Sequence, residues 1–241
     1  MMPGTTSTVL LADDEVNIVT LLEMELQAEG FTVVTATDGI SALKKLREPD
    51  TPVDLALLDW NMAGITGLDI CRRLRETDVS LPVIIMTSRD EIDDRIAALE
   101  TGADDFISKP FNVREVLARV KALIRRATFC KSTFSNEFSS DLLEIGKLAL
   151  NRAERTCTIN GTALILTVRE FDLLDCFMRH PRQALSRGQL IQHVWGDDYF
   201  GDENVVDVFV RYLRKKLEAG GSERVIQTVR GVGFALRMND Q

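Results

Sequence analysis

The sequence lacks several features that mark whole classes of protein. It has no apolar run long enough to cross a membrane, and residues 1–8 lack the basic and apolar regions of a secretion signal. It holds only two histidines, and its four cysteines are scattered without a Cys-x-x-Cys pair. This pattern argues against a zinc site of ordinary ligand spacing and against a disulfide framework. We expect a cytoplasmic protein with reduced thiols and no membrane partner.

Length and charge distribution indicate two domains. At 241 residues the chain is long for one domain, and 45% hydrophobic with 27% charged residues is ordinary for a globular protein. Residues 1–127 carry 14 basic and 22 acidic residues, whereas residues 128–241 carry 15 of each. We predict a first domain over 1–127 and a second over 141–241. The Ser- and Thr-rich stretch 128–140 between them shows no periodicity and is predicted to be a linker.

Five short apolar segments alternate with helical patterns in the first domain. The strands are predicted at 9–12, 31–36, 55–59, 82–86 and 106–107. The helices are predicted at 16–28, 40–47, 68–75, 91–99 and from Asn112 onward. This alternation predicts right-handed βαβ units and an α/β fold with a doubly wound, five-stranded parallel sheet. No glycine-rich loop follows the first strand, so a dinucleotide-binding site is a weak alternative.

Polar side chains suited to phosphate chemistry follow four of the predicted strands: Asp13 and Asp14, Asp59, Thr87 with Ser88, and Lys109. The carboxyl ends of parallel strands share one sheet edge, where ligands of open α/β sheets bind. Clustered carboxylates repel phosphate unless a hard cation such as Mg²⁺ neutralises them. Asp59 would then be a nucleophile that forms an acyl phosphate. Each residue alone could instead cap a helix or face solvent, but their joint position favours a functional site.

This pattern resembles the receiver domain of two-component response regulators over residues 8–126. The resemblance implies a flavodoxin-like fold and a phosphoacceptor role for Asp59, with a sensor histidine kinase as donor. It also implies that Mg²⁺ or Mn²⁺ binds Asp14, Asp59 and the backbone carbonyl of Asn61, with help from Asp13. Where the family commonly has proline, this chain has Ala63.

The resemblance further implies a switch at the strand ends. Thr87 would move toward the phosphate, and Phe106 would turn inward with it. Lys109 would pair with the phosphoryl group, and the Lys109–Pro110 bond would be cis.

Charged residues near the end of the first domain form a predicted dimer face: Arg95, Glu100, Asp105, Glu115, Arg119, Lys121 and Arg126. In the OmpR/PhoB-like branch of response regulators, the matching positions pair across a two-fold homodimer. The implied pairs are Arg95 with Glu115, Glu100 with Lys121, and Asp105 with Arg126. Charged helices are also common as solvated surface without any partner.

The second domain has the pattern of an α+β winged-helix domain. Short strands are predicted at 143–145, 148–151, 156–159 and 162–166, with a two-residue hairpin at Asn160-Gly161. Thr167 and Ser186 begin two helices with capping-box patterns. A third helix over 204–219 precedes a hairpin at 225–229 and 234–237. This third helix and hairpin are rich in basic residues, and a basic helix with a basic hairpin is typical of a winged helix on double-stranded DNA.

Two motifs, Leu166-Thr-Val-Arg-Glu-Phe and Thr228-Val-Arg-Gly-Val-Gly-Phe, resemble the winged-helix effector domain of the OmpR/PhoB family. The predicted DNA-binding positions are Asn204, Val208, Arg211, Tyr212, Arg214, Lys215, Thr228 and Arg230. The loop 195–203 lies where relatives contact RNA polymerase.

We therefore predict a phosphorylation-controlled transcription regulator rather than a turnover enzyme, with two alternatives. An aspartyl-phosphate phosphatase also uses a strand-end aspartate, but such enzymes usually need an acid two residues later, where this chain has Asn61. A constitutive DNA-binding protein would use the first domain only for dimerisation, and its DNA binding would be unchanged by Asp59→Asn.

Overall fold

The computed structural model describes residues 6–78, 80–88, 101–132, 141–196, 199, 203–222 and 225–237. Contacts divide the chain into two compact units, Met1–Arg125 and Arg126–Gln241, which are treated separately below. Among the described residues, no helix is both long enough and apolar enough to span a bilayer. The helix predicted at 91–99 lies outside the described residues.

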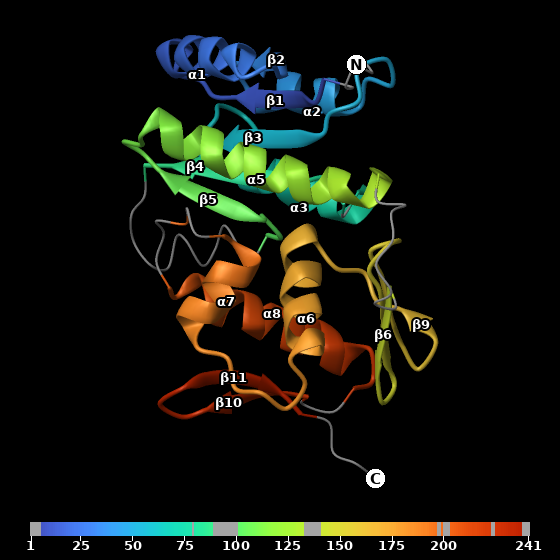
Figure 1. Cartoon of the computed structure of the whole chain (residues 1–241). Coiled ribbons are helices and arrows are strands. Elements are labelled where there is room, and N and C mark those ends of the chain that lie inside the picture. Colours follow the sequence, from blue (N-terminus) through green and yellow to red (C-terminus); the bar gives the residue numbers. More distant parts are fainter. Residues whose placement is uncertain are drawn as a thin grey trace. The chain divides into compact units, whose positions relative to one another are not determined.

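The first unit contains a five-stranded parallel sheet with the order β2-β1-β3-β4-β5 (Figure 1). Its strands are β1 (Thr8–Ala12), β2 (Thr32–Ala36), β3 (Leu55–Asp59), β4 (Val83–Thr87) and β5 (Asp105–Ser108). The helices described with it are α1 (Val16–Ala28), α2 (Gly39–Leu46), α3 (Gly67–Thr77) and α5 (Val113–Ser132). The predicted doubly wound sheet is confirmed.

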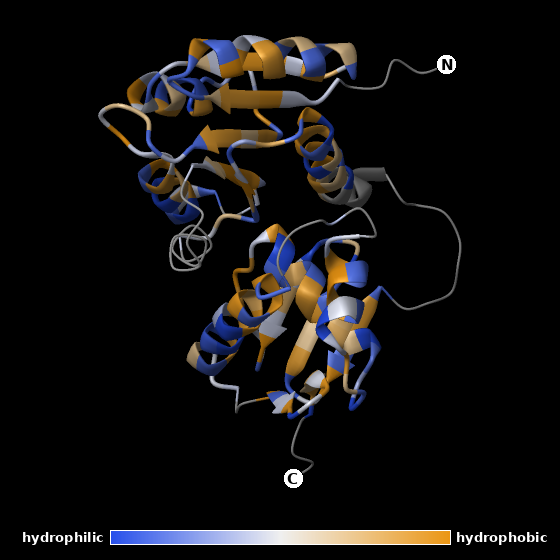
Figure 2. Ribbon diagram, turned by 90° about the vertical axis from the view of Figure 1, so that its left-hand side faces the viewer, coloured by the Kyte–Doolittle hydropathy of each residue, from blue (hydrophilic) through white to orange (hydrophobic). Residues whose placement is uncertain are grey.

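Alternate strand residues fill two separate cores. Leu55 and Leu57 of β3 enter a core built with α1 and α5, whereas Leu58 enters a second core built with α2 and α3. Side chains of a strand point to opposite faces in turn, so a sheet covered on both sides requires nearly continuous apolar strands. In Figure 2, apolar colour predominates along the strands of the parallel sheet, whereas the helices around it carry both apolar and polar colour.

Helix α5 is longer than the sequence analysis predicted. It runs through residues 128–132 to Ser132, into the segment predicted to be linker. These residues include neither proline nor glycine, so nothing in their composition stops a helix that is already formed.

In the described residues of the second unit, a four-stranded antiparallel sheet is joined to three helices and a hairpin. The sheet holds β6 (Leu142–Ile145), β7 (Leu148–Asn151), β8 (Thr156–Ile159) and β9 (Thr162–Ala163). The helices are α6 (Val168–Arg179), α7 (Arg187–Val194) and α8 (Val205–Ala219), and the hairpin is β10 (Ile226–Val229) with β11 (Gly233–Leu236). This is the predicted winged-helix architecture.

The tight turn and the helix caps predicted for the second unit are present. Asn160 and Gly161 both have positive φ, 51° and 76°, which closes the tight turn between β8 and β9. Both predicted capping boxes form, at Thr167 and at Ser186. Strand β9 ends at Ala163, earlier than predicted, because the chain leaves the sheet before the capped start of α6.

Candidate functional site

Three carboxylates meet at the carboxyl end of the parallel sheet. One oxygen from each of Asp13, Asp14 and Asp59 lies within 4.8 Å of the others. Asp13 is fully buried after β1 and Asp59 is buried at the end of β3, whereas Asp14 is exposed. The structure therefore brings together the three side chains that the sequence analysis assigned to a metal site.

Lys109 places its ammonium among these acids. Its Nζ lies 2.7 Å from Asp59 Oδ1, 2.8 Å from Asp13 Oδ2 and 3.1 Å from Glu15 Oε1. Burial alone would lower the pKa of Lys109, but hydrogen bonds to Asp13 and Asp59 outweigh it and raise that pKa. Lys109 is therefore charged at neutral pH, and the bond between it and Pro110 is cis, as expected.

The pKa of Asp13 is raised in spite of the Lys109 ammonium beside it. Burial raises the pKa of its carboxyl group and the Asp59 charge adds to this effect, while hydrogen bonds from Lys109 and from the Glu15 backbone lower it. The net shift is upward. A further cation beside Asp13 would stabilise its buried carboxylate.

The two oxygens of Asp59 are held in different ways. Oδ1 faces Lys109, and Oδ2 accepts a hydrogen bond of 2.7 Å from the Asn61 backbone N–H. Helix α3 starts directly against this strand end. A Cβ on Gly67 would lie 2.3 Å from the Asp59 carbonyl oxygen, so only glycine allows this approach.

The two predicted switch residues line the neighbouring strand ends. Thr87 is fully buried at the end of β4, and its carbonyl accepts a 2.6 Å hydrogen bond from the Lys109 N–H. Phe106 is buried on β5, opposite Ile85 of β4. Thr87 thus lies on the strand next to that of Asp59, and Phe106 lies on the strand that Lys109 follows.

The predicted dimer face is only partly described. Arg119 is buried and holds two acids of that face, with NH1 2.8 Å from Asp105 and NH2 2.7 Å from Glu115. Lys121 pairs with Glu29 at 2.7 Å. These partners belong to the same chain. Arg95, Glu100 and the side chain of Arg126 lie outside the described residues.

The buried Arg75–Asp104 ion pair is another feature of the first unit that was not predicted from the sequence. Arg75 of α3 lies 2.8 Å from Asp104 and also donates to the carbonyls of Gly102 and Leu81. It therefore fastens α3 to the starts of β4 and β5. Glu15, the third acid beside Lys109, was also unassigned, although the acidic run Asp13-Asp14-Glu15 was a visible signal.

Helix α8 has one buried apolar face. Its buried residues are Val205, Val206, Phe209, Val210, Leu213 and Leu217. Asn204, Arg211 and Lys215 are exposed, and Val208, Tyr212 and Arg214 are partly exposed. The structure thus leaves all six predicted α8 positions accessible at least in part, and Thr228 and Arg230 of the hairpin are exposed as well.

Two basic residues of α8, Arg214 and Lys216, bond to other elements of the second unit. Arg214 donates to the Ile226 carbonyl at 2.8 Å and to Thr228 Oγ1 at 2.9 Å, which joins the helix to the hairpin. Lys216 forms an ion pair with Glu170 of the α6 capping box, which joins α8 to α6. Arg211 contacts its neighbour Tyr212, with NH2 3.1 Å from the hydroxyl.

Comparison with known proteins supports both halves of this description. Residues 9–121 match the response regulator receiver domain, and residues 161–236 match the family described as "Transcriptional regulatory protein, C terminal". "Transcriptional regulatory protein PrrA" of Mycobacterium tuberculosis is 46% identical over 239 residues, covering 99% of this chain and 100% of the relative. "Sensory transduction protein RegX3" of the same organism is 39% identical over 231 residues, with coverages of 95% and 99%. A solved structure of a RitR mutant is similar with a TM-score of 0.72 at 30% identity, covering 97% of this chain and all of that one.

Proposed function

The chain belongs to the OmpR/PhoB-type two-component response regulators, which join a receiver to a DNA-binding domain, and we propose that phosphorylation of Asp59 controls its DNA binding. The observation that carries this proposal is the position of the Asp59 carboxylate at the end of β3. It lies between the Lys109 ammonium and the Asn61 N–H, beside the Asp13 and Asp14 carboxylates.

The chemistry would be an in-line transfer to the carboxylate. An oxygen of Asp59 would attack phosphorus while the bond to the imidazole nitrogen of a sensor histidine kinase breaks, leaving an acyl phosphate. Lys109 can follow the charge, because its ammonium already bonds Asp59 and would neutralise a phosphoryl oxygen in the same place. Asp59 would thus be an acceptor, and the chain would not turn over a separate substrate.

The carboxylate cluster suits a divalent cation. Its donors are all oxygens, Asp14 is open to solvent, and burial raises the pKa of Asp13 in spite of the hydrogen bond from Lys109. Asp13, Asp14, Asp59 and the Asn61 carbonyl would hold Mg²⁺ or Mn²⁺. When bound, the cation would supply positive charge to the phosphoryl oxygens.

The phosphate signal would reach DNA through a dimer. Thr87 and Phe106 would carry the change from the site to the face around α5. Asp105, Glu115 and Lys121 have partners within the chain, so pairing across a dimer would require them to exchange or share those partners. Two α8 helices would then reach adjacent half-sites on DNA in the cytoplasm, with the loop 195–203 near RNA polymerase.

Intact-mass spectrometry after incubation with acetyl phosphate and Mg²⁺ tests this proposal. We expect one added phosphoryl group on the wild type, none on Asp59→Asn and none with EDTA. Asp54→Asn is a matched control, because Asp54 lies at the other end of the same strand, where its carboxylate accepts a hydrogen bond from the Thr8 N–H. Labelling of Asp59→Asn, or no labelling of the wild type by acetyl phosphate or by a sensor kinase, would contradict the proposal.

A further inference from the structure

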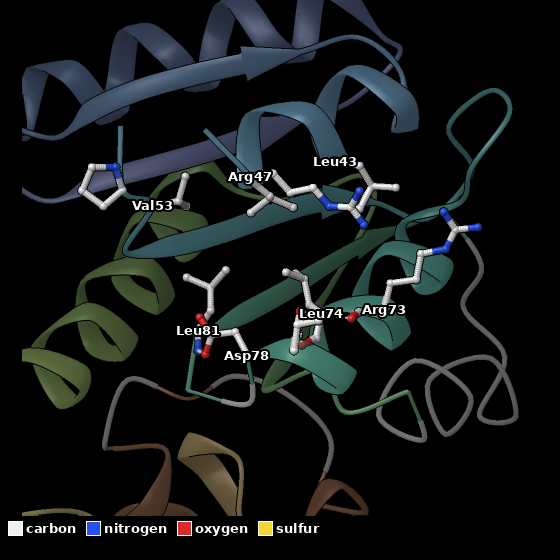
Figure 3. Close-up of a pocket in the computed structure, with 10 residues that line it drawn as sticks. Leu43, Arg47, Val53, Arg73, Leu74, Asp78 and Leu81 are labelled. Carbon is white, nitrogen blue, oxygen red and sulfur yellow. Dashed lines mark hydrogen bonds between the residues drawn. The ribbon is translucent and has the colours of Figure 1, made fainter. Parts of the chain in front are cut away.

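The first unit has a pocket well separated from the carboxylate cluster. It lies between α2 and α3 and has a volume of about 260 Å³ (Figure 3). Val53 and Leu81, which line it, precede β3 and β4, whereas Asp59 and Thr87 end those two strands. The pocket is therefore at the opposite edge of the sheet from Asp59.

The floor of this pocket is aliphatic. Leu43, Leu74 and Leu81 belong to the core between the sheet and the helices α2 and α3, and Leu46 and Val53 pack against that core. Of the described residues that line the pocket, none is aromatic. The floor is thus an aliphatic surface at the edge of the core, and it suits an aliphatic ligand better than a flat aromatic one.

The charged residues of the pocket are arranged unevenly. Figure 3 shows the guanidinium groups of Arg47 and Arg73 on one side of the pocket and Asp78 on the other. Within the described part of the chain, neither guanidinium has a hydrogen-bond or ion-pair partner. Asp78 is already engaged, because its Oδ1 accepts hydrogen bonds from the Ser80 N–H, the Ser80 hydroxyl and the Leu81 N–H.

We propose that this pocket binds an aliphatic monocarboxylate. The tail would lie on the leucines of the floor, and the carboxylate would lie between Arg47 and Arg73, whose planar guanidinium groups match its two oxygens. Two arginines against one aspartate favour a single negative charge on the ligand. Pockets for drug-sized ligands span roughly 300–1,000 Å³, so this smaller one suits a medium-length chain.

Methyl NMR of the full chain, labelled at its leucine and valine methyl groups, tests the proposal with sodium octanoate as probe. We expect saturable shifts at Leu43, Leu74 and Leu81. Octanamide, which has the same tail without the charge, should bind about tenfold more weakly. No saturable shift at these methyls, or equal binding of octanamide, would overturn the proposal. Tighter binding of octyl phosphate than of octanoate would overturn the assignment of a monocarboxylate.

Two neighbouring arginines of α3 give a matched pair of variants. Arg73→Gln removes a guanidinium from the pocket and should weaken octanoate binding about tenfold, as should Arg47→Gln. Arg72→Gln is the control, because Arg72 pairs with Asp69 at 2.8 Å and does not line the pocket. All three side chains are exposed, so thermal melting should match the wild type. Equal octanoate affinity of Arg72→Gln and Arg73→Gln would contradict the proposed role of Arg73.

Discussion

The ammonium of Lys109 lies 2.7 Å from the carboxylate of Asp59, although their strands are not neighbours in the sheet. Strand β4 runs between β3, which ends at Asp59, and β5, after which Lys109 follows. The ion pair therefore bridges across the end of β4, directly beside Thr87. Any group added to Asp59 must displace or share this ammonium.

Loss of the Lys109 charge should destabilise the first unit. Lys109→Met leaves the buried carboxylates of Asp13 and Asp59 facing each other, which should lower the free energy of unfolding by about 3 kcal/mol in urea titrations. Lys121→Met is the control, because its pair with Glu29 is exposed and should contribute less than about 1 kcal/mol. Equal destabilisation by the two variants would contradict this.

The stabilisation by Lys109 should also depend on pH. Because the folded-state pKa of Lys109 is raised, its contribution is fully present below the ordinary lysine pKa and is lost as the pH rises through the folded-state value. The stability difference between the wild type and Lys109→Met should therefore be constant around neutral pH and shrink at strongly alkaline pH.

Asp13→Asn should stabilise the protein in the presence of EDTA. The folded-state pKa of Asp13 is raised, so its charge lowers stability above that pKa, and the effect fades as the pH falls toward the ordinary value of 3.8. We expect Asp13→Asn to have a higher melting temperature than the wild type at pH 7. Mg²⁺ should raise the melting temperature of the wild type more than that of the variant. A lower melting temperature of Asp13→Asn in EDTA would contradict this.

Arg75→Met should weaken the attachment of α3 to the sheet. Its partner Asp104 is fully buried and also accepts from the Val83 N–H at 2.9 Å, so removal of the arginine leaves a buried charge without its ion-pair partner Arg75. We expect a loss of about 3 kcal/mol in unfolding free energy. Arg72→Met, on the same helix but in an exposed pair, should cost less than about 1 kcal/mol. Similar losses of unfolding free energy for Arg75→Met and Arg72→Met would contradict a larger contribution from the Arg75 contacts.

Two arginines of α8 should separate DNA binding from stability. Arg211→Ala should weaken DNA binding, reduce its salt dependence by about one ion, and lower the melting temperature less than Arg214→Ala does. Arg214→Ala should also lower the melting temperature, because the Ile226 carbonyl and Thr228 lose a donor worth about 1 kcal/mol each. Melting curves and DNA titrations at several salt concentrations measure both effects. Equal melting temperatures would contradict the tie between α8 and the hairpin.

Much of the fold and the site could be predicted because short-range patterns decide them. Continuous apolar segments such as 55–58 mark strands covered on both faces, and parallel strands place their carboxyl ends together, so Asp13, Asp59 and Lys109 could be predicted to meet. The caps at Thr167 and Ser186 are equally local. The long-range Arg75–Asp104 pair could not be predicted, because nothing in the residues around either partner specifies the other.

Other features depend on packing or on the absence of a stop signal. The extension of α5 through 128–132 follows from a segment that holds no helix breaker, whereas its Ser and Thr content suggested a linker. The pocket between α2 and α3 depends on how far the leucines of two helices fail to fill the space between them. A sequence pattern shows which residues are apolar, but it does not show where they leave room.

The most direct test of the central claim is the affinity for DNA with and without phosphate on Asp59. A duplex selected from a random library with the phosphorylated protein would be titrated at one salt concentration by fluorescence anisotropy. We predict half-sites about 10–10.5 bp apart and binding about tenfold tighter for the phosphorylated wild type than for the untreated protein. Asp59→Asn should bind like the untreated protein whether or not acetyl phosphate is added. Equal affinity of the phosphorylated wild type, the untreated wild type and Asp59→Asn would contradict phosphorylation control.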